Sequence, residues 1–340
     1  MSNRSVLVAA GIVAALLVWL LPDSGSGPAD RRGGVAGGGV TTSPVEESAE
    51  PEAPWSALEP VEGHGALRSP SGVIVPIVAV RPDGGGYDVR TPCDRPLLVS
   101  DGEVLDGAHV VLDPGHGGDQ TGAVGANGLL ESDLNLAVAL RAAELLRADG
   151  VTVVLTREDD LRVSLATRAA IANSLEPVAF LSIHHNAVAD RAHDGPGTEA
   201  YYQVASEDSR RLAGLVVEEL RDALGGFEVA WETDEGNGAR ARVRSGDEAT
   251  DFYGVLRRTA EGGVTGVLSE AGFLSNPAEA ALFATEAGQQ AEAEALARAL
   301  TRFVAGEAAG DAAFSARPPS TGAVGSAGGS NAGCVDPPLG

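Results

Sequence analysis

PVAFLSIHHNA, residues 177–187, is apolar along most of its length and ends in His184, His185 and Asn186. A strand this apolar on both faces is typical of the interior of a parallel sheet, where helices cover both sides. The polar residues at its end would then lie at the carboxyl edge of that sheet. The segment therefore predicts an inner strand of an α/β domain, with functional side chains at one rim.

The chain on either side of this strand alternates between strand-like and helix-like patterns. The predicted strands are 109–114, 151–157, 177–187, 197–204 and 264–273, and the predicted helices are 131–147, 164–175, 208–225 and 276–304. Such alternation predicts an α/β fold with a mostly parallel (mixed) sheet of about six strands and helices on both faces. The main domain then spans 106–305. Within it we expect 226–250 to form a long irregular connection, either a binding loop or a disordered one.

The amino-terminal segment 1–21 contains one arginine followed by an uncharged apolar run from Val6 to Leu21. This pattern is typical of a cleaved signal peptide or a retained membrane anchor, and a buried core helix is the remaining alternative. The first two alternatives agree that the rest of the chain is exported. Residues 22–70 are rich in Gly, Pro and Ser and predict a disordered linker, and 306–340 predicts a flexible C-terminal tail for the same reason.

A small β element is predicted at 71–105, ahead of the main domain. Three consecutive glycines, 84–86, separate two β-like runs and indicate the turn of a β-hairpin. Cys93 lies in this element and Cys334 in the tail, and the chain has 2 cysteines in all. In an exported protein such a pair most simply forms one disulfide, and two free or intermolecular thiols are the alternative.

The overall composition excludes several classes of protein. The 340 residues carry a formal net charge of -24, so the chain lacks the clustered basic residues that nucleic-acid binding requires. Two cysteines are too few for a zinc cage of thiolates. With 44% hydrophobic residues, the chain can bury a sizeable core.

Four polar residues are expected at the carboxyl rim of the sheet, where α/β folds bind their ligands. His116 follows the first strand, His184 ends the third, Glu270 ends a later one, and Glu131 opens the first helix. Two imidazoles and one carboxylate are a common ligand set of catalytic zinc, and a further carboxylate could transfer protons. On spacing alone, structural histidines and helix-capping glutamates remain the alternative.

Four motifs contain these residues: DPGHGG at 113–118, GLLESDLNL at 128–136, SIHHNA at 182–187 and LSEAGFLSNPAE at 268–279. In their order and spacing they resemble the motifs of the zinc-dependent N-acetylmuramoyl-L-alanine amidases of the type-3 family, over residues 108–304. The resemblance implies a catalytic domain that holds one Zn²⁺ through His116, Glu131 and His184. It also implies that Glu270 is the catalytic glutamate.

Further residues are weaker candidates. Asp113 and Asn186 are expected to orient the metal ligands, because ligating imidazoles usually donate their second N–H to an acceptor. Arg257 lies in a family-like segment and has no assigned role. Arg240, Arg242 and Arg244 either meet carboxylates of a peptide substrate or form a solvated basic run. His185 follows His184 directly, so it should point to the opposite face of the strand and support the site or lie at the surface.

The resemblance implies peptidoglycan as the substrate, recognised through its stem peptide and glycan. We expect a monomeric enzyme in the cell wall or outside the cell, secreted or tethered, with membrane contact only through 1–21. No nucleic-acid partner is expected. Two alternatives remain: a zinc peptidase that cuts within the stem peptide, and a non-catalytic peptidoglycan-binding protein.

Overall fold

The computed structural model describes residues 65–340, apart from 83, 188–190, 235, 318–319 and 323–330. The predictions for 1–21 and for most of 22–70 therefore lie outside the described residues. In the described part of the chain, no helix is both long and apolar enough to cross a membrane. The described residues belong to a single compact unit, Glu50–Gly340.

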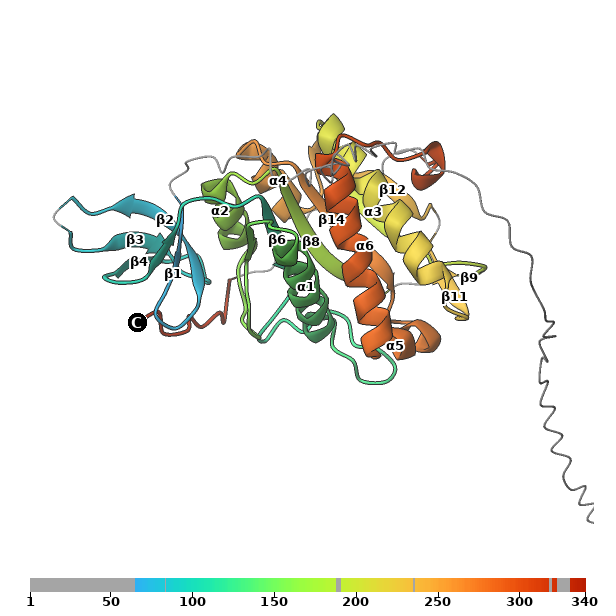
Figure 1. Ribbon diagram of the computed structural model, residues 1–340, viewed down its shortest axis with the longest axis horizontal. Helices are drawn as coiled ribbons and strands as arrows, with labels where there is room; N and C mark the ends of the chain where they lie inside the picture. Colours follow the sequence, from blue (N-terminus) through green and yellow to red (C-terminus); the bar gives the residue numbers. More distant parts are fainter. Residues whose placement is uncertain (1–64, 83, 188–190, 235, 318–319, 323–330) are drawn as a thin grey trace, which may run out of the picture. The chain divides into compact units, whose positions relative to one another are not determined.

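The main sheet confirms the predicted mixed, mostly parallel α/β architecture (Figure 1). Its strands lie in the order β13-β12-β10-β14-β8-β6-β7. They span β6 Val110–Pro114, β7 Val153–Leu155, β8 Ala179–Asn186, β10 Glu199–Tyr202, β12 Gly238–Arg244, β13 Asp247–Asp251 and β14 Gly266–Phe273. The strands β14, β8, β6 and β7 run parallel, whereas β10 is antiparallel to β14 and parallel to β12.

The strands β12 and β13 correct our expectation of an irregular connection at 226–250. The sequence GARARVR of β12 alternates small or apolar residues with arginines, which is the two-residue period of a strand. Ala239, Ala241 and Val243 are buried on one face. The short strands β9 Arg191–His193 and β11 Trp231–Thr233 pair with each other, and β15 Ser320–Gly322 adds to β12.

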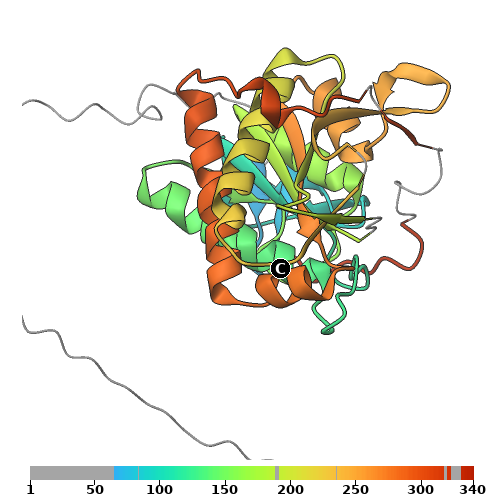
Figure 2. The ribbon, with the colours of Figure 1, turned by 90° about the vertical axis from the view of Figure 1, so that its right-hand side faces the viewer.

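Helices cover both faces of the main sheet (Figure 1 and Figure 2). On one face, α1 Glu131–Ala148, α3 Glu207–Gly225 and α6 Glu286–Val304 pack with the strands in the larger core. On the other face, α2 Leu165–Leu175 and α4 Gly254–Glu261 form a second core with the strands. The predicted helix 276–304 is divided into α5 Pro277–Phe283 and α6, because the Thr285 hydroxyl accepts from the Gly288 N–H and starts a new helix.

The predicted small β element is a five-stranded antiparallel sheet in the order β4-β3-β2-β1-β5. Its strands are β1 Ala66–Arg68, β2 Ile74–Val80, β3 Tyr87–Arg90, β4 Pro96–Val99 and β5 Glu103–Leu105. The strand β1 lies within 22–70, so ordered structure begins before the composition of that range suggested. Most buried side chains of this sheet form a core of their own, which includes Leu339 from the end of the chain, whereas Ala66 and Ile74 pack into the core beneath α2 and α4.

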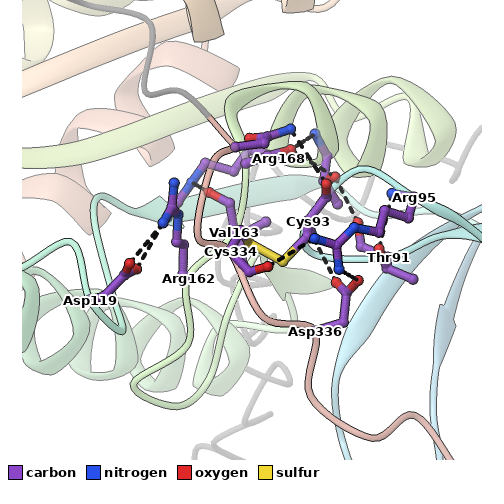
Figure 3. Close-up of a disulfide and its surroundings, with 12 residues drawn as sticks. Thr91, Cys93, Arg95, Asp119, Arg162, Val163, Arg168, Cys334 and Asp336 are labelled. Carbon is purple, nitrogen blue, oxygen red and sulfur yellow. Dashed lines mark hydrogen bonds and ion pairs between the residues drawn. A yellow bond between two sulfur atoms is a disulfide. The ribbon is translucent and has the colours of Figure 1, made fainter.

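The end of the chain is held against the small sheet (Figure 3). Cys93 and Cys334 form a disulfide with their Cα atoms 5.7 Å apart. The Asp336 carboxylate accepts from the Cys93 N–H at 2.8 Å and pairs with Arg95 at 3.1 Å. These contacts, together with the short helix η2 Asp311–Ala313 and β15, show that described parts of 306–340 pack on the domain instead of extending as a free tail.

Candidate active site

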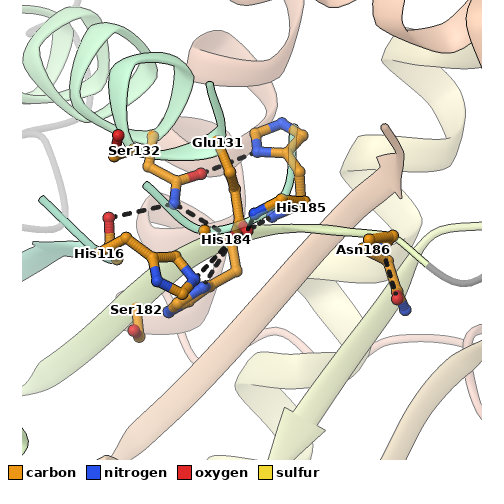
Figure 4. A network of polar contacts seen from close by, with 12 residues as sticks. His116, Glu131, Ser132, Ser182, His184, His185 and Asn186 are labelled. Carbon is orange, nitrogen blue, oxygen red and sulfur yellow. Dashed lines mark hydrogen bonds and ion pairs between the residues drawn. The ribbon is translucent and has the colours of Figure 1, made fainter. Parts of the chain in front are cut away.

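His116, Glu131 and His184 meet at the carboxyl rim of the sheet (Figure 4). His116 lies in the loop after β6, Glu131 is the first residue of α1, and His184 is near the end of β8. Glu131 Oε1 lies 3.2 Å from His116 Nε2 and 3.0 Å from His184 Nδ1. One ligand atom from each residue lies within 4.8 Å of the others, so the three residues could hold a single metal ion.

Gly115 and Gly122 leave the space that the side chains of His184 and Glu131 occupy. A Cβ at Gly115 would lie 2.2 Å from the His184 ring, and a Cβ at Gly122 would lie 2.4 Å from a Glu131 oxygen. Either contact is too short for any side chain. The glycine-rich loop after β6 is therefore required for the three donors to converge.

The Glu131 carboxylate is held by the protein on both oxygens. The backbone N–H of Ala123 donates to Oε2 at 2.8 Å, and that of His185 donates to Oε1 at 3.2 Å. Burial alone would raise the pKa of Glu131, but the adjacent imidazoles of His116 and His184 hold it well below its usual value. The lowered pKa favours the ionised carboxylate of Glu131, which is the form that binds a cation.

Burial lowers the pKa of His184, although the Glu131 carboxylate beside it acts in the opposite direction. A lowered pKa favours the neutral imidazole, which has a free lone pair for a metal. Its neighbour His185 points into the core on the other face of β8, as the alternation of a strand requires. There Nδ1 lies 2.9 Å from Asn135 Oδ1, and Nε2 lies 2.9 Å from Glu292 Oε2. His185 therefore supports the site from behind and does not face the other donors.

Asp113 lies beneath the His116 loop and is nearly inaccessible to solvent. Its carboxylate accepts from Arg168 at 2.6 Å, Thr156 at 2.6 Å and Ser182 at 2.7 Å. Burial raises the pKa of Asp113, but the positive charge of Arg168 and these hydrogen bonds outweigh it, so the net pKa is lowered. Among the described residues, the hydrogen bonds of Asp113 go to Arg168, Thr156 and Ser182 and not to an imidazole nitrogen, so it orients the loop and not a ring.

Two buried arginines fix the conformation of the same loop. Arg168 donates to the carbonyls of Pro114 and His116, and Arg157 donates to those of Pro114 and Gly115. His116 adopts a left-handed backbone with φ 61°, which costs about 1–2 kcal/mol for a residue other than glycine. These hydrogen bonds offset that cost. Neither arginine was predicted from the sequence to belong to the site. An arginine in a segment that is expected to be buried needs hydrogen-bond or ion-pair partners, and this requirement could have indicated such a network.

Glu270 on β14 is in register with His184 on β8, so both side chains project from the same face. Its Oε2 is buried and has no hydrogen-bond partner within the described ranges. Burial, Glu131 and Glu199 raise the pKa of Glu270 well above its usual value, and Arg242 opposes them. A carboxyl group with a raised pKa and a free oxygen beside the donors is suited to accept and return a proton.

Glu199, which the sequence did not single out, lies on β10 and is fully buried. It accepts from Arg240 at 2.7 Å, Tyr201 at 2.9 Å and Asn186 at 3.0 Å. Burial raises its pKa to about 7. The predicted Asn186 thus donates to this carboxylate. Arg240 is also committed to Glu199, so a peptide carboxylate would have to compete for it.

Arg257 does not join the site. It lies on α4, donates to the Asp251 carbonyl at 2.8 Å, and lines a different cavity together with Gln203 and Thr265. Val255, two residues earlier on the same helix, does line the cavity of the candidate site. Two residues turn a helix by about 200°, which places Arg257 on another side. The resemblance of this segment to the family does not specify on which side of the helix Arg257 lies.

A cavity of about 670 Å³ opens over the three donors. Its lining includes His116, Glu131, His184 and Glu270, together with Arg242 and Tyr253. The donor set of two nitrogens and one oxygen suits zinc. A polarising cation beside a proton-transferring carboxyl group is an arrangement for hydrolysis.

Parts of this chain are similar to known proteins. A family model described as N-acetylmuramoyl-L-alanine amidase matches residues 110–302. An uncharacterised protein of Bacillus subtilis, YqiI, is 35% identical over 195 residues, which are 57% of this chain and 83% of that protein. The germination-specific N-acetylmuramoyl-L-alanine amidase of the same organism is 31% identical over 192 residues, covering 52% and 72%. Among solved structures, the amidase AmiC2 of Nostoc punctiforme is similar with a TM-score of 0.48 and 32% identity, covering 58% and 96%.

Proposed function

Because this chain belongs to the N-acetylmuramoyl-L-alanine amidase family, we propose that it hydrolyses the amide bond between N-acetylmuramic acid and L-alanine in peptidoglycan. The proposed cofactor is one Zn²⁺ held by His116, Glu131 and His184. The observation that carries the proposal is the convergence of these three donors in one cavity with Glu270, whose buried oxygen has no protein partner among the described residues.

Each protein group has a distinct part in this reaction. A zinc ion at the site would polarise the scissile carbonyl and lower the pKa of a water molecule. Glu270 accepts the proton of the attacking water and donates it to the amine nitrogen of the departing L-alanine. Arg157 and Arg168 keep the His116 loop in place, and Glu131 is oriented by the backbone N–H groups of Ala123 and His185.

The family and its relatives also suggest where the protein acts. We propose a role in cell-wall remodelling on the outer side of the membrane, with the enzyme secreted or tethered through 1–21. We propose that it acts as a monomer, since the donors and Glu270 all come from one chain.

Digestion of a defined muropeptide by the full chain, with and without a chelator, tests the proposal. We expect release of the intact stem peptide from the glycan, loss of activity with chelator, and recovery with Zn²⁺. Mass spectrometry of the products separates the alternatives. Fragments cut within the stem would indicate a zinc peptidase, and binding to sacculi without any product would indicate a wall-binding protein.

A further inference from the structure

Arg242 differs from the other arginines of the active-site cavity. Arg162 pairs with Asp119 at 2.8 Å and Arg168 pairs with Asp113 at 2.6 Å. Arg242 lines the same cavity, yet no described carboxylate lies within ion-pair distance of it. A guanidinium that is partly removed from water and forms no ion pair with a described carboxylate is a candidate site for an anionic group of a ligand.

Aromatic side chains hold Arg242 in place. Its Cζ lies 4.3 Å from the centre of the Phe252 ring and 5.7 Å from that of Tyr253, and Nη1 donates to the Tyr253 hydroxyl at 3.2 Å. Its Nε is buried and has no hydrogen-bond partner in the described part of the protein. Stacking of this kind pre-organises the planar fork, so less conformational entropy is lost when a carboxylate binds.

Arg242 lines the same cavity as Glu270 and the three proposed metal donors. In a chain of net charge -24, a negatively charged substrate needs a local positive group. In the proposed substrate, the carboxyl group of muramic acid is consumed in the scissile amide. The first negative charge past L-alanine is therefore the α-carboxylate of the second residue, D-glutamate, which is linked through its side chain.

We propose that Arg242 binds this carboxylate and makes the enzyme selective for stem peptides whose second residue is D-glutamate over those in which it is amidated to D-isoglutamine. The inference rests on the proposed function and adds a specificity determinant to it. An amide in place of the carboxylate removes the charge and puts an N–H donor against a guanidinium that can only donate. The penalty therefore falls on the amidated substrate.

The test uses two muropeptides that differ only in this group, and its readout is the ratio of kcat/KM for the carboxylate form to that for the amide form. We expect the zinc-loaded wild-type chain to favour the carboxylate by about tenfold or more, as a charge-assisted hydrogen bond would give. Arg242→Gln should bring the ratio close to one, and Arg242→Lys, which keeps the charge but loses the fork, should give an intermediate ratio. Arg244→Gln is the matched control, because Arg244 lies on the same strand outside the cavity lining and should keep the wild-type ratio.

A wild-type ratio near one, or an Arg242→Gln variant with the wild-type ratio, would overturn the inference. Thermal unfolding of each variant shows whether it is folded. If the wild-type chain cleaves neither muropeptide, the proposed function fails, and calorimetry with the dipeptides L-Ala-γ-D-Glu and L-Ala-D-isoglutamine still decides this inference. Tighter binding of the acidic dipeptide that Arg242→Gln abolishes supports it, and equal binding of the two contradicts it.

Discussion

Glu199 and Glu270 lie directly opposite each other on the antiparallel strands β10 and β14; Glu199 is fully buried, and Glu270 is half-buried with its Oε2 atom inaccessible. Two carboxylates placed this close disfavour ionisation of each other. Arg240 compensates Glu199 at 2.7 Å, whereas Glu270 keeps an oxygen without a protein partner in the described structure. The two glutamates therefore differ in their contacts: Glu199 binds Arg240, whereas Glu270 has an oxygen that is available to accept a proton.

Replacing Glu270 should separate metal binding from turnover. We expect Glu270→Gln to keep Zn²⁺ while kcat falls by about 10²-fold or more, because the general base is lost and the three metal donors are intact. His116→Ala should lose both metal and activity. Elemental analysis and muropeptide hydrolysis measure the two effects. A fully active Glu270→Gln protein would refute the assigned role.

The raised pKa of Glu199 predicts a pH dependence of stability. Its pKa is about 7 in the folded protein against 4.5 when unperturbed, so the folded state binds the proton more tightly. The resulting stabilisation is complete below pH 4.5 and is lost as the pH rises through 7. This stabilisation contributes at most about 3 kcal/mol to the free energy of unfolding.

In the wild-type protein, loss of this stabilisation should lower the free energy of unfolding as the pH rises from 5 to 8. Glu199→Gln should remove this contribution, so its free energy of unfolding should fall less over the same range, by an amount on the order of 3 kcal/mol. Urea denaturation at several pH values measures it, with metal removed from all samples. Glu144→Gln, a change at an exposed position on α1, is the control and should follow the wild-type curve. Parallel curves for Glu199→Gln and wild type would contradict the prediction.

Breaking the Asp113–Arg168 pair should be costly. Arg168→Met leaves a buried carboxylate without its counter-charge and frees the carbonyls of the His116 loop, so we expect a loss of about 3–5 kcal/mol in unfolding free energy. In contrast, Arg81→Met breaks the exposed pair with Asp88 and should cost less than about 1 kcal/mol. Chemical denaturation compares the two variants. Similar losses would show that Arg168 is not a structural anchor.

The Cys93–Cys334 disulfide should stabilise the protein without affecting the metal donors. It links residues 241 apart, so loop entropy predicts a contribution of up to about 5 kcal/mol. Replacing both cysteines by alanine should lower the denaturation midpoint while zinc content stays the same, because the polar contacts of the two cysteines in the described structure are with Asp336, Arg95 and Asn331 and not with a donor residue. Mass spectrometry of a non-reducing digest should find the cross-linked peptide, and its absence would contradict the pairing.

Much of the fold followed from local patterns. The apolar runs at 109–114 and 177–187 predicted inner strands, and both are part of the sheet as β6 and β8. The strand β12 was not predicted, because its three arginines made the segment look like a polar connection although small or apolar residues and arginines alternate along it. Arg240 is buried by its pairing with Glu199, a partner that lies 41 positions away in the chain. Such a pairing has no signature in the sequence near either residue.

The sequence by itself determined the α/β architecture and the convergence of His116, Glu131, His184 and Glu270, because residues at the carboxyl ends of parallel strands meet at one rim whatever their separation. Tertiary structure alone decided that Arg257 faces elsewhere and that Arg157 and Arg168 hold the His116 loop. It also decided which arginine in the cavity is left without a carboxylate. Hydrophobic periodicity is a local property, whereas the partner of a buried charge depends on which distant segments the fold brings together.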